Sequence, residues 1–222
     1  MGLLSSLFGG RKTEDVRQQT LAVHGFSPCP ERHAEIEQRF NDLSSTTRQG
    51  GFRIRDPFFA ESAGHSVFFF IGVPPRMTRG GGVARPVATF MLPFTGAHGR
   101  AHVWLTNSAI QSNPMVAKRI GLAMSVLDEE TPGSRLVTRA IPADWKTRNV
   151  IGAIGEPGRT LDALVEEKTA AILMEAGEHG FFRALFGDGW MALENFPYAQ
   201  AFSAPHGSLG EQCAFARTLI VP

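Results

Sequence analysis

FRIRDPF at residues 52–58 and VFFFIGV at residues 67–73 decide the fold of this chain. In the first stretch, apolar residues alternate with Arg53 and Arg55, and such an alternation predicts a half-buried strand. The second stretch is apolar throughout and rich in residues that favour extended backbone, which predicts a central strand covered on both faces. The core of the fold is therefore expected to be a β-sheet.

Two further stretches continue this pattern, VARPVATFML at residues 83–92 and AHVWLT at residues 101–106. The links between the strands contain glycine and other turn-forming residues. Four strands joined by short links predict an antiparallel meander, in which each strand pairs with the next one along the chain.

Helical patterns flank these strands on both sides. Residues 13–24 and 30–43 precede the strands, and Pro30 suits the first position of the second helix. Residues 114–127 and 160–176 follow the strands, with apolar residues at helical spacing. The remaining segments predict a short helix at 181–186 and strands at 136–141, 190–196 and 213–221. The predicted fold is therefore α+β, an antiparallel meander sheet flanked by N-terminal and C-terminal helices.

The composition limits the class of protein. Hydrophobic residues make up 43% of the 222 residues, charged residues make up 19%, and the formal net charge is +1. This balance excludes a disordered chain, and no apolar run reaches the roughly 18 residues that a membrane-spanning helix needs. We expect one α+β domain over residues 13–222, with a sub-boundary near 107–134 left open, preceded by a separate segment, residues 1–12.

The cysteines and the N-terminus indicate the compartment. Two cysteines, Cys29 and Cys213, are too few for a disulfide scaffold and suggest free thiols in a reducing compartment. The chain begins MGLLSSLFGGRK, with its basic residues after the short apolar stretch, whereas a secretory signal has them before it. The sequence therefore predicts a cytoplasmic protein.

Apolar residues of the N-terminal segment predict a docking surface. Leu3, Leu4, Leu7 and Phe8 fall at helical spacing. A short amphipathic segment of this kind can dock on the protein's own surface or on a partner protein, or it can lie on a membrane surface. Because the apolar patch is only about two turns long, docking on a protein is the favoured interpretation, and peripheral membrane contact is the alternative.

Charge is distributed unevenly along the chain. Residues 51–125 contain eight basic and two acidic side chains, whereas residues 126–222 contain eight basic and thirteen acidic ones. Either the basic strands bind an anion, or the two regions pack against each other and neutralise their charges. The near-neutral total favours the second interpretation.

The strand at 101–106 and the residues before it present a basic face. Alternation places His98, Arg100 and His102 on one side, and Arg53 and Arg55 would join them if the two strands were close. Such a face could bind phosphate or carboxylate through charge-assisted hydrogen bonds. Acidic and thiol ligands are lacking nearby, so we expect no metal there.

The sequence AIGEPGRT, residues 153–160, resembles part of a phosphate-binding loop followed by a helix. Arg159 stands where such a loop has lysine, and arginine does not simply replace a lysine that reaches terminal phosphates. A turn leading into a helix is the simpler interpretation, and phosphate binding stays open.

Other motifs do not predict a metal, cofactor or nucleic acid. HGFSPCPERH, residues 24–33, brings Cys29 together with two histidines, but a structural zinc site needs a fourth ligand. The basic, glycine-rich stretch at 74–85 lacks aromatic residues to stack on bases. The aromatic-rich stretch at 180–193 is expected to be core rather than a partner-binding patch.

The favoured function is that of a non-catalytic protein-binding module, which docks on an unidentified partner or a membrane surface through Leu3, Leu4, Leu7 and Phe8. The alternative is a small-molecule or anion-binding protein, or an enzyme, that uses the basic histidine and arginine face described above. We find none of the common catalytic sequence motifs in the chain.

Overall fold

The computed structural model describes residues 14–45, 51–74, 86–105, 135–146, 150–195 and 208–220. The N-terminal segment 1–12, the predicted helix at 114–127 and the proposed boundary near 107–134 lie outside these residues.

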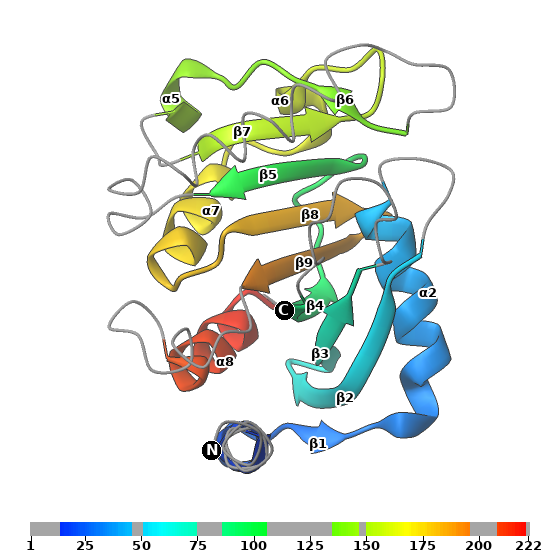
Figure 1. Ribbon diagram of the computed structural model, residues 1–222. Helices are drawn as coiled ribbons and strands as arrows, with labels where there is room; N and C mark the ends of the chain where they lie inside the picture. The colour runs from blue at the N-terminus through cyan, green and yellow to red at the C-terminus, as the bar shows by residue number, and fades with distance from the viewer. Residues whose placement is uncertain are drawn as a thin grey trace, which may run out of the picture.

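An antiparallel β-sheet with helices on both faces forms this part of the molecule (Figure 1), and the predicted α+β class is confirmed. Nine strands follow the order β1-β2-β3-β4-β9-β8-β5-β7-β6, and every neighbouring pair is antiparallel. The strands are β1 (Ser27–Pro28), β2 (Arg53–Ser62), β3 (His65–Val73), β4 (Val87–Pro93), β5 (Ala101–Leu105), β6 (Val137–Thr138), β7 (Val150–Gly155), β8 (Arg183–Gly187) and β9 (Trp190–Asn195).

The continuous apolar run of β3 is covered on both faces, as its sequence predicts. Phe68 and Phe70 lie in a core cluster with α2 (His33–Ser44). Phe69 and Ile71 lie in the larger cluster on the other face, with α6 (Leu161–Leu164), α7 (Thr169–Glu178) and α8 (Leu209–Thr218). Figure 1 shows α2 and these three helices on opposite sides of the sheet.

The meander holds for β1 to β4, but β5 is not the neighbour of β4. The hairpin of β8 and β9 lies between them in the same sheet. Asp188 and Gly189 make its two-residue turn with φ of 52° and 76°, the positive angles that an Asp-Gly hairpin turn requires. The prediction of a short helix at 181–186 is therefore wrong, because this turn signal pairs the two flanking apolar segments as strands.

The N-terminal helices agree with the sequence patterns. Residues 14–23 are helical, and a 3₁₀ turn, η1 (Pro30–Arg32), leads into α2 with Pro30 at its start. Ile36, Phe40 and Leu43 form the buried face of α2. Leu21 is fully buried on the opposite side of the sheet and fixes the first helix there.

The predicted helix at 160–176 is interrupted. Its first turn is α6, and α7 begins only at Thr169. Between them, Val165 forms a β-bridge with Ala97, and the Glu166 amide donates to the Gly96 carbonyl at 2.9 Å. These contacts with a distant loop replace the helical hydrogen bonds, which the apolar spacing alone does not reveal.

The predicted strand at 213–221 is also wrong, because residues 209–218 form α8. Ser208 and Glu211 make a capping box: the Ser208 side chain accepts from the Glu211 amide, and the Glu211 carboxylate accepts from the Ser208 amide. The capping box starts a helix just before the apolar segment, and the segment continues that helix as far as Thr218. The predicted strand at 136–141 shortens to β6 and is followed by α5 (Ala143–Lys146).

The two cysteines are free and buried, and they lie in clusters on opposite faces of the sheet. Burial raises the pKa of the Cys29 thiol to about 11 and that of Cys213 to about 12. None of the helices in the described residues is long and apolar enough to cross a bilayer.

Candidate functional site

A groove of about 240 Å³ lies between α2 and the turn that joins β8 to β9. Glu35, Arg39 and Asp42 line it from α2, and Asp188 and Trp190 line it from the hairpin. The groove therefore combines a large aromatic ring with charged groups of both signs.

Arg100 fixes the two walls of this groove relative to each other. Its Nη1 donates to the carbonyl of Asp42 at 3.0 Å, and its Nη2 lies 2.6 Å from Oδ2 of Asp188. A Cβ at Gly187 would lie 2.9 Å from the Arg100 side chain, so glycine allows this close approach. One of the arginines predicted for ligand binding thus joins α2 to the hairpin.

Trp190 forms the aromatic surface of the groove. Its ring stacks on Phe68 with centroids 6.1 Å apart, and the guanidinium of Arg39 lies 4.2 Å from the centre of the Trp190 ring. Oε1 of Glu35, one turn earlier on α2, lies 3.8 Å from Nη2 of Arg39. Hydrogen bonding to Arg32, the largest contribution, lowers the pKa of the Glu35 carboxyl, so this carboxylate stays charged beside the groove.

His102 lies under the C-terminal end of α2 and is fully buried. Its Nε2 is 2.7 Å from the carbonyl of Leu43 and must donate to it, which leaves Nδ1 unprotonated and without a hydrogen-bond partner. Burial, the largest cause, and the charges of Arg183 and Arg100 together lower the pKa of His102 to about 3. The ring is therefore neutral at pH 7 and joins β5 to α2.

A buried ion pair continues the polar groups along this face of the sheet. Arg183 on β8 contacts Glu194 on β9 at 2.5 Å, and the Glu194 side chain is 0% exposed. Burial raises the pKa of Glu194, whereas the charge of Arg183 and its hydrogen bond lower it. Such a pair aligns two neighbouring strands, and losing either partner would leave an uncompensated buried charge.

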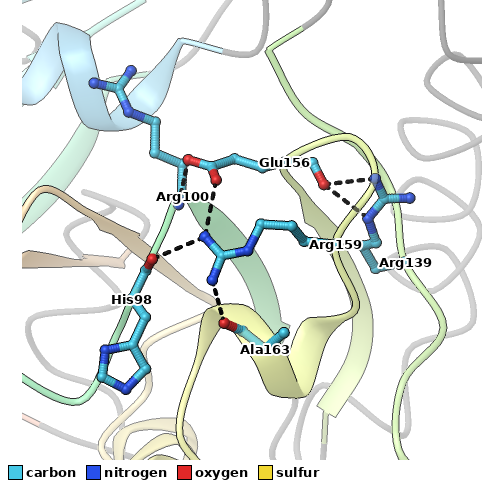
Figure 2. Close-up of polar contacts among 6 residues, drawn as sticks. All are labelled: His98, Arg100, Arg139, Glu156, Arg159 and Ala163. Carbon is cyan, nitrogen blue, oxygen red and sulfur yellow. Dashed lines mark hydrogen bonds and ion pairs between the residues drawn. The ribbon is translucent and has the colours of Figure 1, made fainter.

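Figure 2 shows how the AIGEPGRT loop is held. Arg159 donates to the carbonyls of His98 at 2.9 Å and Ala163 at 2.5 Å, and it lies 3.3 Å from Oε2 of Glu156. Oε1 of Glu156 accepts from the Arg100 amide, and its carbonyl accepts two bonds from Arg139. Both terminal nitrogens of Arg159 are thus engaged in closing the loop, as a structural turn requires.

The structure does not bring the five predicted ligand-binding residues together. His102 and Arg100 lie near α2, whereas His98 is exposed and pairs with Glu166 at 3.0 Å. Arg53 and Arg55 lie on β2, five strands from β5 in the sheet order, which corresponds to roughly 24 Å at the usual strand spacing. The predicted docking residues Leu3, Leu4, Leu7 and Phe8 lie outside the described residues.

Sequence reasoning did not single out the groove residues. The stretch at 180–193 is mostly core as expected, with Phe181, Leu185 and Phe186 fully buried, but Trp190 is only half-buried. The available signal was the Asp188–Gly189 pair, which predicts a hairpin turn and places Trp190 beside it.

Three other clefts lie on the described surface. One of about 740 Å³ lies beside β6 and α5 and includes Asp144, Asp162 and Glu167. Another of about 610 Å³ joins α2 to β2 and includes Glu37 and Asp42. The last, of about 470 Å³, lies between α7 and the end of α8. Among the described residues, no three histidine, cysteine or carboxylate side chains are grouped to hold a metal ion.

No protein-family model matches this chain, and no curated protein matches it. Among solved structures, the chain is similar to the crystal structure of the mycobacterial trehalose monomycolate transport factor A, TtfA. The two share 10% sequence identity, with 96% of this chain and 97% of that chain covered and a TM-score of 0.47.

His102 should make stability depend on pH. Its pKa is about 3 when folded and about 6.5 when unfolded, so between these values the unfolded chain binds the extra proton. The free energy of unfolding should fall as pH decreases below about 6.5, with this one group contributing up to about 1.4 kcal/mol per pH unit. Urea unfolding at several pH values measures this dependence. From pH 6 to 4, the free energy of unfolding should fall less per pH unit in His102→Gln than in the unmodified protein, and an equal pH dependence would contradict the assignment.

The variant Arg159→Lys distinguishes the two interpretations of residues 153–160, a structural turn and a phosphate-binding loop. One amine cannot replace the forked contacts to His98, Ala163 and Glu156, so we expect a loss of about 1–2 kcal/mol in the free energy of unfolding and no ATP binding. Arg55→Lys, at an exposed position on β2, is the matched control. Equilibrium dialysis showing that Arg159→Lys gains ATP would establish a phosphate loop instead.

Proposed function

We propose that this chain is a non-catalytic, cytoplasmic protein-binding domain, and that a partner protein binds in the groove between α2 and the β8–β9 turn. The observation that supports this most directly is the half-buried Trp190 ring with the Arg39 guanidinium 4.2 Å from its centre at that groove. Tryptophan and arginine are the residues most enriched where protein interfaces gain their binding energy.

The size of the groove favours a protein partner over a cofactor. Cofactor and drug-sized ligands occupy pockets of about 300–1,000 Å³, whereas this groove holds about 240 Å³. Such a volume suits one or two side chains of a partner that lies across it. Because Phe68 and Arg100 hold Trp190 and the groove walls in place, little ordering would be needed on binding.

The charges of the groove suggest what the partner presents. Arg39 pairs with Glu35, and Arg100 pairs with Asp188. Within the described residues, the Asp42 carboxylate makes no ion pair. A partner segment with an apolar or aromatic side chain over Trp190 and a lysine or arginine beside Asp42 would therefore complement the groove.

The outer edge of β2 is poorly suited to adding a strand from a partner. The Ile54 amide donates to Glu37 at 2.9 Å, the Phe52 amide donates to Asn41 at 2.8 Å, and His33 bonds the Ile54 carbonyl at 3.0 Å. These α2 side chains occupy the backbone groups that a new strand would need. A partner at this edge would therefore bind through side chains on the exposed face of α2 and not by strand pairing.

The N-terminal segment offers a second contact in this proposal. Leu3, Leu4, Leu7 and Phe8 would dock on the same partner, and a membrane surface is the alternative. The buried free thiols of Cys29 and Cys213 support the cytoplasmic location, since a reducing compartment keeps cysteines unpaired.

A photocrosslinking residue in place of the exposed Gln38, which lines the groove, tests the partner site. In cell extract it should give one discrete protein adduct, and adding Arg39→Ala or Trp190→Ala should weaken that adduct at least severalfold. Arg55→Ala is the matched control, and it should leave the adduct unchanged. Since Trp190→Ala removes a stacking contact with Phe68, its thermal unfolding must be measured alongside. An adduct that survives both groove variants would reject the proposed site.

Removing residues 1–12 tests the second contact. The shortened protein should bind the crosslinked partner more weakly, because the apolar area of Leu3, Leu4, Leu7 and Phe8 is lost. Flotation with lipid vesicles distinguishes the alternative: loss of vesicle binding without any change in partner binding would assign the segment to a membrane. If neither changes, the segment has no docking role.

A further inference from the structure

The cleft of about 470 Å³ lies on the face of the sheet opposite the Trp190 groove. It is bounded by the end of β4, the start of α7 and the end of α8, and Figure 1 shows the two helices on the same side of the sheet. Phe94, Ile172, Leu219 and Ile220 provide apolar walls. Its volume falls within the range of pockets that hold small molecules.

The charge of this cleft differs from that of the other clefts described above. Each of the other three includes at least two carboxylates. The lining of this cleft includes none, and its titratable side chains are His65 and Lys168. An apolar cavity with basic groups at its rim complements a molecule that has an apolar body and one negative charge.

The start of α7 adds to this preference. Lys168 and Thr169 begin the ten-residue helix at the cleft, and the N-terminal end of a helix has partial positive charge. The backbone amides of Thr169 and Ala170 already donate to the backbone carbonyls of Glu166 and Glu167. The helix would therefore contribute its dipole, and these two amides would not bind the ligand. Lys168 would contribute the direct contact, because its side chain is 75% exposed. Its Nζ lies 2.7 Å from Glu166, so a ligand carboxylate would share or replace this exposed ion pair.

The walls of the cleft are held firmly. The Thr169 hydroxyl donates to the Gly96 carbonyl at 3.2 Å, and a Cβ at Gly96 would lie 2.6 Å from that hydroxyl oxygen. The Phe94 amide donates to the Gly189 carbonyl at 2.8 Å. A preformed cavity of this kind can take up a ligand without first ordering its walls.

We propose that this cleft binds a small anionic amphiphile, such as a medium-chain fatty acid, with the chain against Phe94, Ile172 and Leu219 and the carboxylate at Lys168 and His65. This site is separate from the Trp190 groove and does not depend on the proposed protein-binding function. The ligand is taken to be a free molecule in solution and not a lipid within a bilayer.

Titration with decanoate, below its critical micelle concentration, tests the proposal on the full chain. Calorimetry should show saturable binding to one site, and spectra of the isoleucine methyl groups should show shifts at Ile172 and Ile220. Thr95→Trp, at an exposed position of the lining, should fill the cleft and abolish binding. Lys168→Gln should weaken decanoate about twofold to fivefold, the usual worth of an exposed charge pair, and should leave decanol binding unchanged.

Lys146→Gln, an exposed lysine on α5, is the control for the lysine variant, and thermal unfolding confirms that Thr95→Trp is folded. The absence of saturable binding by the unmodified protein would overturn the proposal, as would undiminished binding by folded Thr95→Trp. Equal affinity for decanol and decanoate would overturn the assignment of an anionic ligand. Binding to vesicles that contain phosphatidylglycerol, without binding to free decanoate, would overturn the assignment of a free molecule.

Discussion

The need to cover both faces of the central strands determines this structure. Phe68 and Phe70 of β3 point to one side and Phe69 and Ile71 to the other, and all four are buried. Fully burying a side chain of this size contributes about 1.5–3 kcal/mol, so neither face can stay open to water. The helix α2 therefore covers one face, and α6, α7 and α8 cover the other.

Much of this architecture could be predicted from the sequence, because the period of the apolar residues reports burial directly. The run around Phe69 predicts a doubly covered strand, and the spacing of Ile36, Phe40 and Leu43 predicts α2. Two elements differ from the prediction for different reasons. The apolar segment after Ser208 is a helix because of a local signal, the Ser208–Glu211 capping box, whereas Val165 leaves the helical pattern because of a long-range contact, its pairing with Ala97. The predicted basic face failed to assemble because strand order, which the local sequence does not contain, separates β2 from β5.

The arginines of this chain act mainly as cross-links to backbone carbonyls and to carboxylates. Arg100, Arg139 and Arg159 each donate to carbonyl oxygens at the ends of strands or helices, and Arg217 bonds the His24 carbonyl at 2.9 Å. A guanidinium has five donors in a fixed plane and can hold several acceptors at once. Arg100, from the basic region 51–125, pairs with Asp188, from the acidic region 126–222. This contact supports the interpretation that the two regions neutralise each other's charge.

The groove on one face and the cleft on the other are joined by a short path through the sheet. Trp190, in the groove, is the cross-strand partner of Pro93, which lines the cleft. Next to this pair, the Phe94 amide bonds the carbonyl of Gly189 in the β8–β9 turn. This backbone connection offers one physical route for energetic coupling between the two sites. Coupling between two binding sites is reciprocal. If a ligand in the cleft shifted the turn and so changed the affinity of the groove for its partner, the partner would change the affinity of the cleft for the ligand by the same factor.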